Sequence, residues 1–167
     1  MKSQFRAFLI LALIALVIAI LRFFMEGWVA PLGISTRIGS LFASLTILLL
    51  VGLFVLFVRE GLAAGGRYVR AATWFVPLAA WCEILVIAGI LLTARTGATT
   101  YYSDTMQRPG QAPPIPTQHA LMHAIAFVPI AAIGLLLGAI IYWLSKRGRP
   151  GRPAVAASAA APQTREA

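Results

Sequence analysis

Four long apolar segments dominate the chain, and short polar stretches separate them. A helix needs about 20 apolar residues to cross the hydrocarbon core of a bilayer, because each residue advances it by about 1.5 Å. The segments are continuously apolar and lack the period-2 alternation of barrel strands, which indicates helices. The pattern therefore predicts four transmembrane helices, over residues 7–28, 38–58, 71–93 and 120–144.

These elements predict an all-α integral membrane protein, a four-helix bundle with up-down topology over residues 1–144. The third connection, residues 94–119, is much longer than the roughly 2–8 residues that join bare helices. It could be a docking surface or a spacer, and Tyr101, Tyr102 and Asp104 could cap a pocket. Residues 145–167 show no periodicity and are rich in Ala, Pro and charge, which predicts a disordered basic tail.

The start of the chain resembles a signal peptide, since Lys2 and Arg6 precede the first apolar run. No A-x-A cleavage site follows, and apolar character resumes after Arg22. We therefore expect the first helix to be retained.

Basic residues fall mostly on one side of the predicted helices. Three lie on the opposite side: Arg37, Arg95 and Arg108. The positive-inside rule then places both termini in the cytoplasm and predicts a multi-pass protein of the cell membrane. The nine residues on the cytoplasmic side are Lys2, Arg6, Arg59, Arg67, Arg70, Lys146, Arg147, Arg149 and Arg152.

Composition excludes the usual soluble classes. The chain is 60% hydrophobic and 11% charged, whereas soluble domains are about 45–50% apolar and about 25% charged. The net charge of +9 would suggest nucleic acid in a soluble protein. Here the charges flank apolar segments, so no nucleic-acid partner is expected. The bilayer is the expected partner, with anionic lipid at the basic start of the tail, residues 146–152.

One carboxylate, Glu83, lies in the middle of the third apolar segment. A charge at such a depth costs several kcal/mol, so it usually has a partner or a function. Ala79 and Ala80 share its helix face and mark a surface of close packing. We therefore expect Glu83 to point into the bundle. Its neighbour Cys82 is the single cysteine, which excludes an internal disulfide and suggests a small buried hydrophobe.

The other polar side chains of the apolar segments lie at a similar depth. From the helical rise, Glu83 is about 12 Å below the outer boundary, Arg22 about 9 Å, His123 about 6 Å and Glu26 about 3 Å. All of them occupy the outer half, which predicts a shared polar pocket. The candidate ligand-binding or ion-binding residues are Glu83, Arg22, His123 and Glu26.

Each of these residues also has a structural interpretation. Arg22 and Glu26 are spaced i, i+4 and could pair only with each other. Glu83 could be protonated, or paired with Arg22, and serve only to fix helix packing. His119 and His123 have a spacing that can place two imidazoles on one metal ion, but the metal would need further ligands. The sequence does not identify a cofactor.

The fourth segment contains a GxxxG pair, Gly134 and Gly138. Small residues let helix backbones approach closely within a membrane. The pair could serve packing inside the chain, or a homo-oligomer or hetero-oligomer. His119, His123, Ile130 and Gly134 lie on one stripe of this helix, which should face another helix.

No nucleophile motif, P-loop or dinucleotide fingerprint is present, so no enzyme activity is predicted. We expect a small accessory or interaction subunit. One alternative is binding or transport of an ion, a proton or a small ligand through the outer pocket. Another is a membrane enzyme or redox protein with His123 as base or metal ligand. Direct pairing without a cavity would favour a structural role, whereas an open pocket lined by Glu83, Arg22 and His123 would favour binding.

Overall fold

The computed structural model describes residues 2–25, 27, 30–32, 44–98, 100–104 and 115–148. This part of the chain is all-helical. Its four long helices are α1 (Lys2–Phe23), α4 (Leu45–Leu62), α5 (Tyr68–Thr96) and α7 (Pro116–Arg147), and its short ones are η1 (Ala30–Leu32) and α6 (Tyr101–Asp104). Each long helix is long and apolar enough to cross a membrane. The predicted all-α class, with four helices of spanning length, is thus confirmed for the described residues.

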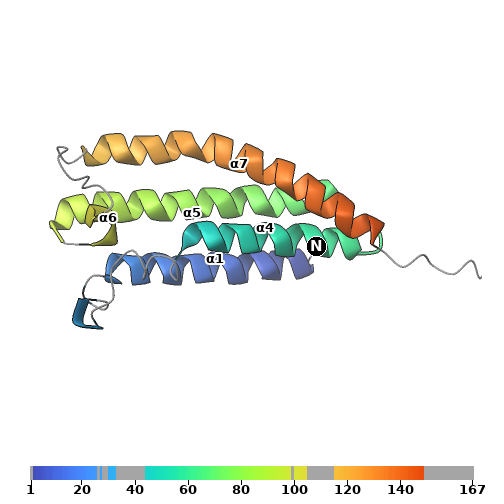
Figure 1. Cartoon of the computed structure of the whole chain (residues 1–167), viewed down its shortest axis with the longest axis horizontal. Coiled ribbons are helices and arrows are strands. Elements are labelled where there is room, and N and C mark those ends of the chain that lie inside the picture. The colour runs from blue at the N-terminus through green and yellow to red at the C-terminus, as the bar shows by residue number, and fades with distance from the viewer. Residues whose placement is uncertain are drawn as a thin grey trace, which may run out of the picture.

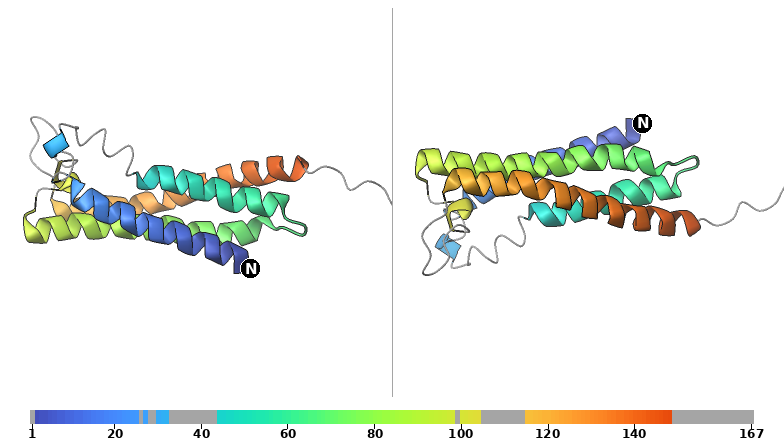
Figure 2. Two further views of the ribbon diagram at one scale, coloured as in Figure 1. Left: turned by 90° about the horizontal axis from the view of Figure 1, so that it is seen from below. Right: turned by 90° about the horizontal axis from the view of Figure 1, so that it is seen from above.

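The four long helices lie side by side and alternate in direction (Figure 1). The start of α1, the α4–α5 turn and the end of α7 share one end of the bundle, which we call the N-terminal end. The short helix α6 lies at the opposite end, the α6 end (Figure 2). Helix α5 packs against all three other long helices, and α4 also contacts α1 and α7.

The helices do not begin and end where the apolar segments do. Helix α4 continues to Leu62 and α5 begins at Tyr68, so the connection predicted at 59–70 is a short turn. Helix α7 runs to Arg147, past the predicted start of the tail. Polar and basic residues can extend a helix beyond the apolar stretch, because their helix propensity is favourable. Parts of the predicted second helix (residues 38–43), third connection (residues 105–114) and tail (residues 149–167) lie outside the described residues.

The core is built from aromatic and aliphatic side chains of α1, α4 and α5. Phe57 and Phe75 are fully buried, and their rings lie against Gly138 and Gly134 of α7. A methyl group at either glycine would collide with the facing ring. The GxxxG pair therefore serves packing inside this chain, while its use in an oligomer stays a prediction.

Polar side chains tie the N-terminal end together. The buried Glu60 carboxylate accepts from the Gln4 amide at 3.1 Å and from the Arg67 backbone N–H at 3.0 Å, and it lies 3.6 Å from the Arg70 guanidinium. The Tyr142 hydroxyl donates to the Gly66 carbonyl at 2.9 Å. These bonds fix the α4–α5 turn against α1 and α7.

Candidate functional site

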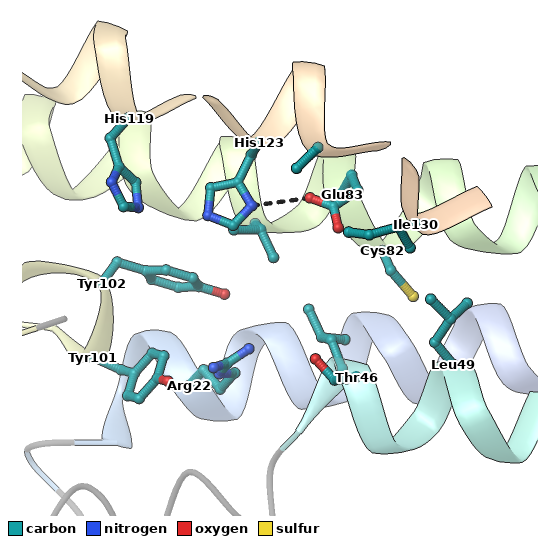
Figure 3. A pocket seen from close by; sticks show the side chains of 13 residues that line it. Arg22, Thr46, Leu49, Cys82, Glu83, Tyr101, Tyr102, His119, His123 and Ile130 are labelled. Atoms are coloured by element: carbon teal, nitrogen blue, oxygen red, sulfur yellow. Dashed lines mark hydrogen bonds and ion pairs between the residues drawn. The ribbon is translucent and has the colours of Figure 1, made fainter. Parts of the chain in front are cut away.

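A cavity of about 390 Å³ lies near the α6 end of the bundle, between the four long helices and α6 (Figure 3). Every long helix contributes to its wall. The lining residues are Arg22 of α1; Leu45, Thr46 and Leu49 of α4; Cys82, Glu83 and Val86 of α5; Tyr101 and Tyr102 of α6; and His119, His123, Ala126 and Ile130 of α7.

The cavity exists because α4 begins deeper in the bundle than its neighbours. In Figure 1, the start of α4 lies short of the α6-end termini of α1, α5 and α7. The Ser44 hydroxyl caps this start by accepting from the Ile47 N–H at 3.3 Å. The first turns of α4 supply Leu45, Thr46 and Leu49 to the wall. Three helices thus surround a space that the fourth does not fill.

Glu83 and His123 meet on the α5 and α7 side of this cavity. The Glu83 Oε2 and the His123 Nδ1 lie 3.0 Å apart, joining α5 to α7. The Glu83 side chain is 14% exposed and that of His123 is 32% exposed. Glu83 thus points into the bundle, on the face where Ala79 is fully buried. With a proton on Nδ1, His123 donates to the carboxylate in a charge-assisted hydrogen bond.

Arg22 lines the same cavity but has different partners. Its guanidinium carbon lies 4.1 Å from the centre of the Tyr101 ring and 5.8 Å from that of Tyr102, which is cation–π geometry. Among the described residues, its Nε is buried without a hydrogen-bond partner, and it forms no ion pair. The pairing of Arg22 with Glu83 that the sequence suggested is therefore replaced by Glu83–His123. Glu26, the other candidate partner of Arg22, lies outside the described residues.

The short helix α6 covers the cavity from the α6 end. Gly97, with φ of 64°, ends α5 in the left-handed region that glycine tolerates, and the chain turns back there. The Thr100 hydroxyl accepts from the Tyr102 N–H at 3.2 Å and lies 2.8 Å from the Thr93 hydroxyl. The Tyr102 ring is buried against Gly89.

The Tyr102 phenol projects into the cavity between the two histidines and Arg22 (Figure 3). Burial raises the pKa of this phenol above its ordinary value, and the Arg22 guanidinium offsets part of the rise. Tyr101 and Tyr102 thus lie where the sequence placed a cap over the pocket. Asp104 was also expected in this cap, and its side chain is not among those that the structure describes.

His119 also borders the cavity, one turn before His123. The two imidazole rings are 5.1 Å apart between centroids and inclined by 58°. Among the described residues, no group of three or more His, Cys, Asp or Glu side chains could hold a metal ion. The Nδ1 of His123 is also engaged by Glu83. The two histidines therefore offer a metal no third protein ligand within the described part of the chain.

Two lining residues with a hydroxyl or thiol group were not among the sequence candidates: Thr46 and Cys82. Cys82 was expected to be a small buried hydrophobe, and it is 3% exposed. Cys82 lies four residues before Val86, which also lines the cavity, so the two share one helix face. The sequence could not place Thr46 on the cavity wall, because the hydrophobic pattern of an evenly apolar helix does not show which side faces the bundle.

The cavity does not continue as a polar path towards the N-terminal end. An apolar groove of about 160 Å³ between α4 and α7 shares Thr46, Leu49 and Ile130 with it, and its other lining residues are apolar. Phe75, which lines this groove, is fully buried, as are Phe57 and Leu78. Among the described residues, the polar lining thus ends near Glu83 and Thr46.

Three polar groups surround the cavity: the Glu83 carboxyl bonded to His123, the Arg22 guanidinium and the buried Tyr102 phenol. Its chemistry fits binding of a small polar molecule. Comparison with known proteins yields no matching family, no matching curated protein and no matching solved structure.

Proposed function

We propose that this chain is a multi-pass protein of the cell membrane that binds a small acidic molecule in the pocket at its α6 end. Support for membrane insertion comes from the outward faces of the helices as well as from their length. Large apolar side chains such as Leu13 and Leu136, which are 62% and 66% exposed, point away from the bundle. Water would solvate such faces poorly, whereas lipid chains solvate them well.

The charges support a defined orientation. The described basic residues gather at the N-terminal end, where Arg59, Arg67 and Arg70 join those at the start of α1 and the end of α7. At the α6 end the described basic residues are Arg22 and Arg95. The positive-inside rule then places both termini in the cytoplasm and the pocket in the outer half.

The observation that supports binding is that Arg22, Glu83 and His123 line one open cavity. A carboxylate that only fixed helix packing would need a partner but no cavity. Glu83 and His123 satisfy each other, whereas Arg22 faces two aromatic rings and no described carboxylate. A guanidinium presents a planar set of donors that matches a carboxylate, so the ligand should be an acid. The volume lies within the range of small-molecule sites, about 300–1,000 Å³.

These observations support ligand binding better than they support transport or a role as an accessory subunit. A transported ion would meet the apolar core of Phe57, Phe75 and Leu78 below the pocket. The accessory-subunit hypothesis relied on packing faces, the GxxxG pair and the long third connection. This chain's own rings already cover Gly134 and Gly138, and residues 105–114 of that connection lie outside the described residues. If the protein does act as a subunit, the pocket is where it would sense a ligand.

The single cysteine gives a direct test, because Cys82 lies on the cavity wall. The purified protein in nanodiscs is treated with methyl methanethiosulfonate, and modification of Cys82 is followed by intact mass. Benzoate, a small acid, should slow the reaction in a saturable way, whereas benzamide, its neutral isostere, should not. Arg22→Gln should remove the protection, and Arg95→Gln, the matched control, should keep it.

Glu26 supplies an informative second variant. If its carboxylate neutralises Arg22, Glu26→Gln should strengthen protection by benzoate; if it does not, protection should match the wild type. Equal protection by benzoate and benzamide, survival of protection in Arg22→Gln, or no protection at tens of millimolar benzoate would each contradict an acid-binding pocket.

A further inference from the structure

A second cavity, an open groove, lies between α1 and α4 at the N-terminal end of the bundle. Its volume is about 620 Å³, larger than that of the pocket beneath α6. It is lined by one hydroxyl, two arginines and four aliphatic residues: Ser3, Arg6, Ala7, Ile10, Leu11, Val55 and Arg59. Both arginines had been expected to lie outside the helices. They lie within α1 and α4 instead, so the helical backbone fixes where each side chain starts.

Charge and apolar surface are layered along this groove. Arg6 and Ile10 are spaced i, i+4 on α1, and Val55 and Arg59 have the same spacing on α4. Residues four apart share a helix face. Because the two helices are antiparallel, both arginines lie towards the N-terminal end and both aliphatic side chains lie one turn deeper. Ile10 is 60% exposed, so the deeper part of the groove is open to whatever surrounds the bundle.

The two arginines have no internal counterion among the described residues. The described carboxylate nearest them in the sequence, Glu60, follows Arg59 directly but is turned away and buried. Its oxygens already engage Gln4, the Arg67 N–H and Arg70. Neither the Arg6 nor the Arg59 side chain forms an ion pair or a hydrogen bond within the described residues. The groove thus presents two positive charges above an apolar floor.

We propose that this groove binds one anionic phospholipid of the inner leaflet. The phosphate lies between the Arg6 and Arg59 guanidinium groups, which can each donate two hydrogen bonds to it. One acyl chain follows Ile10, Leu11 and Val55 into the bilayer. Basic pockets between membrane helices on the cytoplasmic side are suited to such headgroups. A phosphatidylcholine fits less well, since its own ammonium compensates the phosphate charge.

This site rests on the membrane placement proposed above but not on the acid-binding pocket. Its test uses the full chain in vesicles of phosphatidylcholine with a minor amount of acyl-chain spin-labelled lipid. The immobilised spin-label fraction reports lipid held by the protein. We expect labelled phosphatidylglycerol to be immobilised preferentially over labelled phosphatidylcholine. The preference should reach at most about five-fold per arginine, the equivalent of about 1 kcal/mol.

Charge-matched variants separate this site from general surface charge. The double variant Arg6→Gln/Arg59→Gln should lose the preference. The double variant Arg67→Gln/Arg147→Gln removes two charges at the same end, outside the groove, and should keep it. An equal loss in both variants, or no preference in the wild type, would overturn the proposal.

A third variant guards against a folding defect in the double arginine variant. Ile10→Trp alters an exposed position, so the fold should persist while the apolar floor is filled. It should reduce the immobilised phosphatidylglycerol and leave the Cys82 protection by benzoate unchanged. Unchanged immobilisation in Ile10→Trp would contradict an acyl chain in the groove. A wild type that fails to join vesicles would instead contradict membrane insertion itself.

Discussion

The Glu83 carboxyl depends on a neighbouring helix for its hydrogen bond to His123. The bond to His123 joins α5 to α7 across 40 positions of the sequence, and both side chains are at least half buried. A polar group in such surroundings costs free energy when its partner is removed, more than the bond itself contributes. The pair is therefore expected to matter for stability as well as for the shape of the pocket.

Replacing His123 by alanine should destabilise the protein by about 1–3 kcal/mol, because the Glu83 carboxyl loses its partner within the bundle. Reversible unfolding in mixed detergent micelles measures this free energy. In a double-mutant cycle, His123→Ala/Glu83→Ala should cost less than the sum of the single changes. His119→Ala is the control, as its ring forms no hydrogen bond among the described residues; an equal cost for both histidines would contradict the pairing.

The sequence predicted the direction of Glu83 but not its partner. Ala79 and Ala80 marked the close-packed face, and that face does turn into the bundle. Arg22 and His123 were both candidates, because depth along a helix can be counted from the sequence. The choice between them depends on helix rotation and on α6, whose Tyr101 ring lies beneath the Arg22 guanidinium. No residue spacing encodes that contact.

At the scale of elements, α7 approaches α4 and α5 through its two glycines. Phe75 lies over Gly134 and Phe57 over Gly138, so large rings fit where side chains are absent. Close packing of this kind is what holds helices together in lipid, so it accords with the proposed membrane placement. The same contacts set the position of His123, about three turns before Gly134 on α7.

Gly138→Ala should therefore destabilise the protein by about 1–3 kcal/mol, since the new methyl group collides with the Phe57 ring. Unfolding in mixed micelles again gives the measurement. Phe57→Leu should relieve the collision, so the double variant should cost less than the two single changes together. Ala132→Leu, on the exposed face of α7, serves as control and should be nearly neutral. A harmless Gly138→Ala would place this face away from α4.

At the scale of the whole molecule, the two ends of the bundle have opposite character. The N-terminal end holds most of the described basic residues, the Glu60 network and the groove of Arg6 and Arg59. The α6 end holds the pocket and the short helix that covers it. This asymmetry supports one orientation in the membrane.

Cysteine labelling on intact cells tests that orientation. The variants carry Cys82→Ala, so that each has a single cysteine. Ala64→Cys places it at an exposed position in the α4–α5 turn, and Ala98→Cys places it at a half-buried position before α6. A membrane-impermeant maleimide should label the Ala98→Cys variant from outside. The Ala64→Cys variant should react only after permeabilisation. The reverse pattern would invert the topology, and labelling of both variants from outside would contradict a four-span bundle.

By itself, the sequence determined the parts that depend on position along one helix: four helices of spanning length and the ends of the bundle where basic residues gather. Those follow from the helical rise and from the cost of charge in an apolar medium. The tertiary structure alone decided which polar groups meet, that α4 begins deep enough to leave a cavity, and that Phe57 and Phe75 cover the glycines. The physical reason is that these helices are apolar on nearly every side, so the hydrophobic pattern marks no face, and rotation and neighbours are set by side-chain packing.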